Sequence, residues 1–153
     1  MNMLKISLSS LKEKLNDYPF VDQLMDVIEK IKKYDPVGIV LFGSLAAGDF
    51  LNDSDADIVV IFGDERMDFL ETISELKKLD DTGYIDFFPY GWKQFSDMLR
   101  DFNLLALDAF ARGYTIHIGD ETIWKRILNV GAGVMRDVEP IENGWKVKVV
   151  ENL

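Results

Sequence analysis

Two short apolar runs joined by a Gly-Ser turn and an Asp-Ala-Asp sequence constrain the fold most strongly. The first run, residues 37–42, ends at Gly43-Ser44, and the second, residues 58–62, directly follows Asp55-Ala56-Asp57. Side chains in a strand alternate between its two faces, so residues two apart point the same way. We therefore expect Asp55 and Asp57 to project their carboxylates from one face, at one end of a sheet.

Close carboxylates need a cation. Two of them repel each other, which raises a pKa unless a positive charge lies between them. Mg²⁺ suits this role because it takes oxygen ligands and keeps coordination positions for phosphates. A third acid, Asp86, lies within the apolar run 84–88, where an unpaired charge is costly unless a metal offsets it. Taken singly, these features also fit an ordinary tight turn, solvated acids at a strand start and a solvent-facing strand position.

The remaining periodicity predicts a mixed α/β (α+β) fold with a short mixed sheet, helices packed mainly on one side, and a C-terminal hairpin. The whole chain, 1–153, is expected to be one domain with its core at about 19–130. Asn143-Gly144 predicts a type I′ turn between strands 134–142 and 145–150, which either covers a sheet edge or serves as an interface. Strands are expected at 37–42, 57–62, 84–88 and 114–118. Helices are expected at 4–15, 20–31, 45–48, 67–79, 91–100, 104–112 and 121–130.

Composition excludes several classes of function. The chain has 153 residues and no cysteine, which rules out disulfides and thiolate chemistry and fits a cytoplasmic protein. No apolar run approaches the roughly 18 residues that span a membrane, and no secretory signal is recognisable at the start. The net charge is −10 without a basic stripe, so direct nucleic-acid binding is not expected.

Together, these motifs resemble the signature of the DNA polymerase beta-like nucleotidyltransferase superfamily in its minimal, antitoxin-like form. The resemblance covers about residues 35–130 and includes Arg112-Gly113 before the late strand 114–118. It implies transfer of a nucleoside monophosphate, AMP from ATP, to an acceptor hydroxyl, with two Mg²⁺ ions. The implied catalytic and metal-binding residues are Asp55, Asp57 and Asp86. The implied phosphate-binding residues are Gly43, Ser44 and Gly48.

The chain departs from that signature beside the Gly-Ser pair. Close family members often carry arginines there, whereas this chain has Leu45 and Ala47. Lys93, Arg112 and Arg126 either supply the missing positive charge from elsewhere or are ordinary surface charges. The single histidine, His117, lies in an alternating strand and is expected to be structural.

Three functional hypotheses follow. In the resembling family the chain is often paired with a helical HEPN-type protein, on which a tyrosine is adenylylated, as in toxin–antitoxin modules. A second hypothesis is a small-molecule enzyme of the aminoglycoside-modifying type, since an acidic chain suits a cationic substrate. A third is a non-catalytic binding module on the same fold. The C-terminal hairpin also allows self-association.

Overall fold

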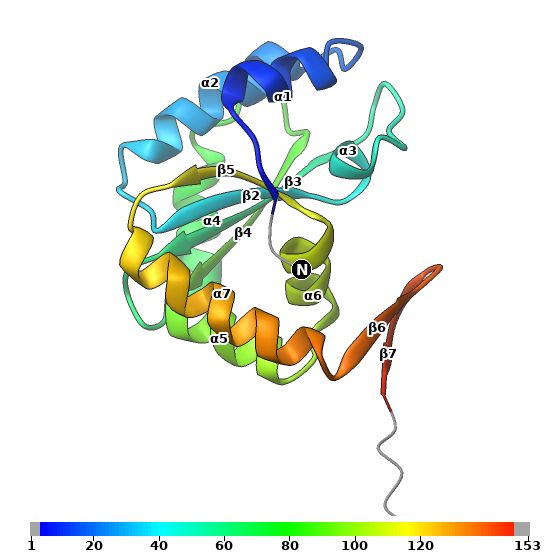
Figure 1. Cartoon of the computed structure of the whole chain (residues 1–153). Helices are drawn as coiled ribbons and strands as arrows, with labels where there is room; N and C mark the ends of the chain where they lie inside the picture. The colour runs from blue at the N-terminus through cyan, green and yellow to red at the C-terminus, as the bar shows by residue number, and fades with distance from the viewer. Residues whose placement is uncertain (1–3, 149–153) are drawn as a thin grey trace, which may run out of the picture.

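One mixed β-sheet organises the chain, and the computed structural model describes residues 4–148 of it (Figure 1). Its five strands lie in the order β1-β5-β2-β3-β4. β2 runs antiparallel to both β3 and β5, whereas the outer pairs β1–β5 and β3–β4 are parallel. The strands are β1 (Leu4–Lys5), β2 (Gly38–Phe42), β3 (Ala56–Phe62), β4 (Ile85–Gly91) and β5 (Tyr114–Ile118).

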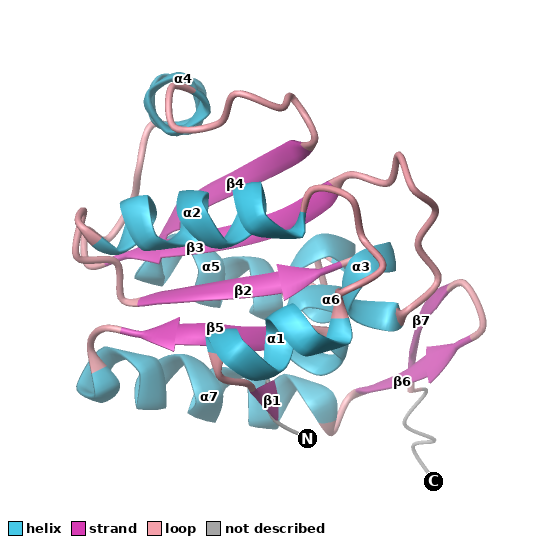
Figure 2. Cartoon of the chain, turned by 90° about the horizontal axis from the view of Figure 1, so that it is seen from above, coloured by secondary structure: helices cyan, strands magenta, loops and turns pink. Residues whose placement is uncertain are grey.

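Helices cover both faces of this sheet. α1 and α2 pack on one face, α5, α6 and α7 pack on the other, and α4 lies beside the edge strand β4 (Figure 2). The predicted class, a mixed α/β fold with a short mixed sheet and a C-terminal hairpin, is confirmed. The prediction that the helices pack mainly on one side of the sheet is wrong, because they cover both faces. The helices are α1 (Leu8–Lys14), α2 (Val21–Lys32), α3 (Ser44–Ala47), α4 (Phe69–Lys77), α5 (Trp92–Arg100), α6 (Leu104–Arg112) and α7 (Glu121–Met135).

The two-sided cover follows from the composition of the central strands. Every residue of β2 is buried, and β3 is buried from Ile58 to its end. Ile58 and Val60 join the core beneath α1 and α2, while Val59 and Ile61 join the core beneath α5, α6 and α7. A strand buried on both faces reads as a continuous apolar run, so the period-two signal that would reveal a solvent-facing side is missing.

The strand register brings the ends of three strands together. Phe42 at the end of β2 lies opposite Asp57 near the start of β3. Asp57 in turn lies opposite Asp86 near the start of β4, because these two strands are parallel. The Gly43 turn and the acid-bearing strand starts therefore share one end of the sheet.

Three element boundaries differ from expectation for identifiable reasons. Pro89 does not end β4, because β4 is an edge strand on which a missing backbone N–H is tolerated. The start of the helix predicted at 4–15 instead forms β1, which pairs with β5. α7 continues past Val130, because Gly131 is buried within the helix against Phe110.

The C-terminal hairpin forms a separate two-stranded sheet of β6 (Val138–Ile141) and β7 (Gly144–Val147), seen at the lower right of Figure 1. It contacts α6 and α7 and does not cover an edge of the main sheet. Gly144 pairs with Ile141, so the tight loop is Glu142-Asn143 rather than Asn143-Gly144. Neither loop residue has a positive φ, which excludes the predicted type I′ turn. The predicted strand residues Val149 and Val150 lie outside the described residues.

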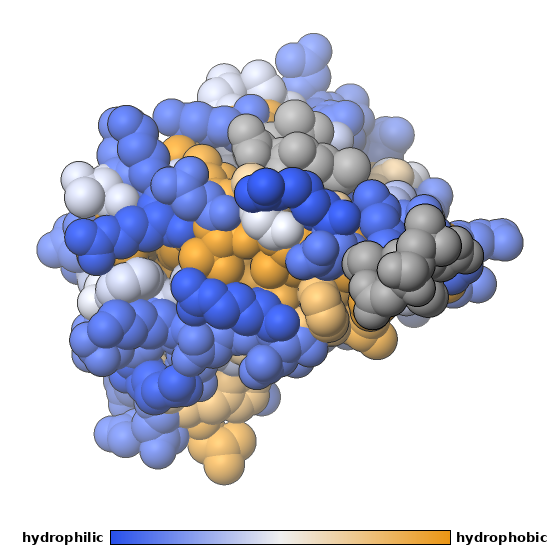
Figure 3. Space-filling model, turned by 60° about the horizontal axis from the view of Figure 1, so that its bottom comes forward, coloured by the Kyte–Doolittle hydropathy of each residue, from blue (hydrophilic) through white to orange (hydrophobic). Residues whose placement is uncertain are grey.

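Seen from below, hydrophilic residues surround an apolar area on the surface of the protein (Figure 3). Among residues 4–148, no helix combines the length and apolar character needed to cross a bilayer.

Close packing between α6 and α7 yields a matched pair of variants. A Cβ on Gly131 would overlap the buried ring of Phe110, whereas one on Gly133 would have Arg136 Nη2 as its nearest neighbour at 3.8 Å. We expect Gly131→Ala to lower the free energy of unfolding by about 1–3 kcal/mol. Gly133→Ala should raise it by up to about 1 kcal/mol, because alanine favours the helix.

Urea titration followed by circular dichroism measures both changes. Unchanged stability in Gly131→Ala would contradict the tight α6–α7 contact.

Candidate active site

Three aspartates gather where β3 and β4 begin. Asp55 is exposed directly before β3, Asp57 is half-buried on β3, and Asp86 is exposed on β4. Asp57 and Asp86 are register partners, so their side chains leave adjacent strands on the same face. Asp55 lies two residues before Asp57, as the alternation predicts. The structure therefore brings the three predicted acids to one end of the sheet.

The acids influence one another electrostatically. Burial, then the charges of Asp86 and Asp55, and a hydrogen bond with Asp86 raise the pKa of Asp57 from 3.8 to about 6. The pKa of Asp86 is also raised, first by burial and then by Asp55, with Lys77 opposing the shift. Such mutual repulsion is what a divalent cation between the carboxylates relieves.

The three aspartates carry the donor atoms that a metal needs, but their side chains are not yet arranged around a common point. Among residues 4–148, no three carboxylate or imidazole groups are drawn together as a ready-made metal-binding cluster. The donor set nevertheless consists of carboxylate oxygens, which hard cations such as Mg²⁺ prefer. A cation bound between Asp57 and Asp86 would lower their raised pKa values.

Gly43 connects the predicted phosphate turn to the acids. Its φ is 76°, a conformation that side chains rarely adopt, and a Cβ here would collide with Asp57 Oδ2. Ser44 begins α3, the single helical turn that ends at Gly48, whose φ is 82°. The turn and the carboxylate of Asp57 are therefore in direct contact, whereas Gly48 lies at the far end of α3.

The two positions that depart from the family signature have different surroundings. Leu45 is 2% exposed and belongs to the core beneath α1 and α2. Ala47 borders a cavity of about 170 Å³ together with Gly43, Asp108 and Arg112. α3 itself carries no charged residue.

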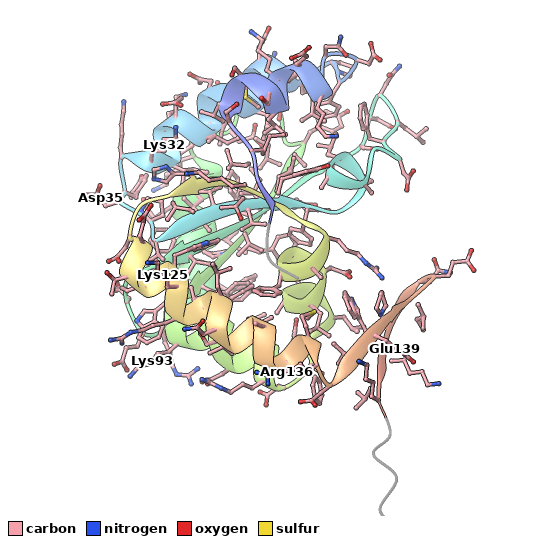
Figure 4. The ribbon with its side chains drawn as sticks, in the orientation of Figure 1. Lys32, Asp35, Lys93, Lys125, Arg136 and Glu139 are labelled. Carbon is pink, nitrogen blue, oxygen red and sulfur yellow. The ribbon has the colours of Figure 1, made fainter. Side chains whose placement is uncertain are left out.

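Of the three basic residues considered from the sequence, two lie at the other end of the sheet. Lys93 follows β4 and forms an ion pair with Glu65 at 2.8 Å, and Figure 4 places it away from α3. The guanidinium of Arg126 lies 5.7 Å from the ring centroid of Trp92, the first residue of α5. Only Arg112 of this group lies near the Gly43 turn.

The loop before β3 is held by side chains that sequence reasoning partly missed. The buried Tyr18 hydroxyl donates a hydrogen bond to the Ser54 carbonyl at 2.7 Å. Ser54 Oγ accepts one from the Leu51 backbone N–H at 2.8 Å, which braces this turn. Burial, followed by the charges of Asp55 and Asp80, raises the pKa of Tyr18 to about 12, which keeps the hydroxyl protonated as a donor.

Aromatic packing supports the same end of the sheet. Phe20 stacks on Tyr84 at 4.3 Å between ring centroids, and Tyr18 meets both Phe20 and Phe50 edge-on at 5.7 Å. These residues come from three separate segments, so no local motif announces them.

His117 lies on β5 opposite Ile39, away from the acids. Burial lowers its pKa, with Lys32 as the next cause. This placement agrees with a structural residue.

The family model of the nucleotidyltransferase domain matches residues 22–101. A crystal structure of a protein from Sulfolobus solfataricus, provisionally assigned as a nucleotidyltransferase, is similar with 18% identity and a TM-score of 0.47. The similarity covers 69% of this chain and 85% of that one. No curated protein matches the chain.

The raised pKa of Asp57 predicts how stability depends on pH. Its value is higher in the folded chain than the ordinary 3.8, so the folded chain holds more protons between pH 4 and 6. Stability contributed by this group is therefore full below the ordinary pKa and is lost as the pH rises through about 6. We expect metal-free Asp57→Asn to be more stable than wild type at pH 7 by about 1 kcal/mol after allowing for solvent screening.

Calorimetric melting at pH 4.5 and pH 7 measures this difference, which should shrink at the lower pH. Asp53→Asn removes the same charge from an exposed position in the preceding loop and serves as the control. A lower melting temperature for Asp57→Asn than for wild type at pH 7 would contradict the electrostatic account.

The hydrogen bond from Tyr18 gives a second prediction. Tyr18→Phe leaves the Ser54 carbonyl without this partner, which should cost about 1–3 kcal/mol of unfolding free energy. Backbone amides of residues 49–55 should also exchange faster with deuterium, as mass spectrometry can record. Tyr34→Phe, at a position 49% exposed, is the matched control and should change neither quantity. Equal exchange in both variants would rule out a bracing role.

Proposed function

The chain belongs to the nucleotidyltransferase domain family, and we propose that it transfers AMP from ATP to an acceptor hydroxyl in a Mg²⁺-dependent reaction. The observation that carries this proposal is the contact between the Gly43 turn and the carboxylate of Asp57. The Gly43 turn has no room for a side chain because the Asp57 carboxylate lies there, and Asp57 is the register partner of Asp86. A phosphate at this turn would therefore be next to the acids.

Each residue has a distinct role in this proposal. The backbone of the Gly43-Ser44 turn and the Ser44 hydroxyl donate hydrogen bonds to the phosphate chain. Asp55 and Asp57 hold the metal ions, and Asp86 faces the incoming acceptor. Two Mg²⁺ ions, when bound, offset the charge on the attacking and leaving oxygens of an in-line displacement.

Asp86 is the group placed to accept the proton of the acceptor hydroxyl. It is exposed at the strand start, so an external hydroxyl can approach it. The attacking oxygen forms a bond to the α-phosphorus while the bond to the leaving pyrophosphate breaks.

The acceptor in this proposal is a hydroxyl on another protein, a tyrosine of a helical HEPN-type partner. The exposure of Asp55 and Asp86 supports an acceptor that arrives from outside. The chain's net charge of −10 favours a basic partner surface.

One observation favours a second candidate, a non-catalytic binding module. α3 carries no cation, and Leu45 is buried in the core rather than directed at a ligand. In this alternative the acidic end of the sheet holds a partner without nucleotide chemistry. The experiment below separates the two candidates.

Transfer of label from α-³²P-ATP tests the enzyme. The purified protein is incubated with Mg²⁺ and with the protein encoded by the neighbouring gene, as a candidate acceptor. Label should appear on that protein, and Asp55→Ala and Asp57→Ala should each reduce the rate by at least about 100-fold, because metal ions contribute several kcal/mol to such displacements. Chelation with EDTA should abolish transfer.

Asp53→Ala is the matched control, since it removes an exposed aspartate from the same loop. It should retain transfer within about threefold, as expected for an exposed charge away from the chemistry. Absence of both transfer and Mg²⁺-dependent ATP binding would favour the binding module.

A further inference from the structure

A phosphate chain at the Gly43 turn needs a positive charge that the turn itself lacks. α3 consists of Ser44-Leu45-Ala46-Ala47 and offers none, while the neighbouring acids repel phosphate. Mg²⁺ ions held by the acids would offset part of this repulsion, and the turn itself would add only backbone N–H groups and the Ser44 hydroxyl. A cation contributed by another element would therefore strengthen triphosphate binding.

One basic side chain borders the space beside the turn. The cavity of about 170 Å³ is lined by Gly43 and Ala47 from the α3 segment and by Asp108 and Arg112 from α6. This volume is below the roughly 300 Å³ at which whole small-molecule sites begin, so it suits a phosphate group rather than a nucleoside. The small side chain of Ala47 helps leave this space open.

The C-terminal hairpin holds the Arg112 guanidinium in place. Arg112 Nη2 donates hydrogen bonds to the carbonyls of Ile141 at 3.2 Å and Gly144 at 3.3 Å. The guanidinium also lies 4.7 Å from the ring centroid of Trp145. Its freedom is thus reduced before any ligand arrives, which lowers the entropic cost of binding.

Asp108 completes the arrangement. Its Oδ1 accepts hydrogen bonds from Trp145 Nε1 at 2.8 Å and from Arg112 Nη1 at 3.4 Å. The shorter bond goes to Trp145, so the carboxylate primarily fixes the indole on which Arg112 rests. Asp108 and Trp145 are positioning residues in this arrangement.

Arg112 retains binding capacity after these contacts. A guanidinium has five N–H donors, and its hydrogen bonds within the described part of the chain number three. The side chain is 41% exposed, so it is not buried as a closed structural clamp. Lys14 also approaches α3, but it lines a different cavity with Gly48 on the α1 side.

We propose that Arg112, held by the hairpin β6–β7, binds the β- or γ-phosphate of a nucleoside triphosphate across the cavity from Gly43. This inference rests on the proposed function, because it assumes a nucleotide at the Gly43 turn. It assigns the hairpin a role: the hairpin completes the phosphate site through Arg112.

Calorimetric titration with Mg²⁺–ATP and with AMP tests the assignment. Arg112→Ala should weaken ATP binding by about 10- to 100-fold, the usual range for a charge-assisted hydrogen bond. AMP, which lacks the β- and γ-phosphates, should bind both proteins alike. Trp145→Ala should weaken ATP binding by about 2- to 5-fold, because it removes the stacking that positions the guanidinium.

Two further variants keep the test decisive. Arg126→Ala removes an arginine that also rests on a tryptophan, but at the other end of the sheet, and should bind ATP like wild type. Arg112→Gln retains donors for the hairpin carbonyls while removing the charge, so it should lose ATP binding even if Arg112→Ala folds poorly. Melting curves without nucleotide report folding in each variant.

The outcomes separate this inference from the proposed function. Wild-type ATP affinity in both Arg112 variants overturns the inference and leaves transfer chemistry intact. Equal loss of ATP and AMP binding also overturns it, because a phosphate-specific contact cannot produce that result. Selective loss of ATP binding supports Arg112 even if no label transfer occurs, in which case only the proposed enzyme activity fails.

Discussion

The space beside Gly43 that a side chain would fill is occupied by the Asp57 carboxylate, and the architecture of the site depends on this contact. It joins the end of β2 to the start of β3 without any intervening side chain. Any larger residue would separate the turn from the acids, and the positive φ already disfavours one. The proposed phosphate and metal positions are adjacent for this reason.

That contact is maintained because the strands carrying it are fixed from both sides. β2 and the later part of β3 are buried beneath two helical layers, so their ends cannot slide relative to one another without exposing apolar surface. The Tyr18 bond to Ser54 then anchors the loop that delivers Asp55. A rigid scaffold thus holds the three acids. Burial first, and then the nearby like charges, raise the pKa values of Asp57 and Asp86. Perturbed pKa values of this kind are typical of functional sites.

The acids of the site and its proposed phosphate-binding cation come from different elements of the fold. Acids lie on β3 and β4, whereas the proposed phosphate-binding cation comes from α6 and is held by the hairpin. A core made only of the sheet and α1 to α5 would lack that cation. The hairpin, which does not cover the main sheet, is thereby connected to the site through α6.

The sequence by itself determined the main strands, the α6 bounds, the Gly-Ser turn and the shared face of Asp55 and Asp57, because apolar runs and strand alternation are local signals. It could not reveal that helices cover both faces, since strands buried on both sides have no polar alternation to read. It placed the hairpin near its observed position but one residue off at the turn, and it missed β1, whose pairing depends on β5. Only the tertiary structure decided that Arg112, and not Lys93 or Arg126, borders Gly43, and that Tyr18 holds Ser54. Those contacts join residues distant in the chain, and their proximity follows from packing, which no local pattern encodes.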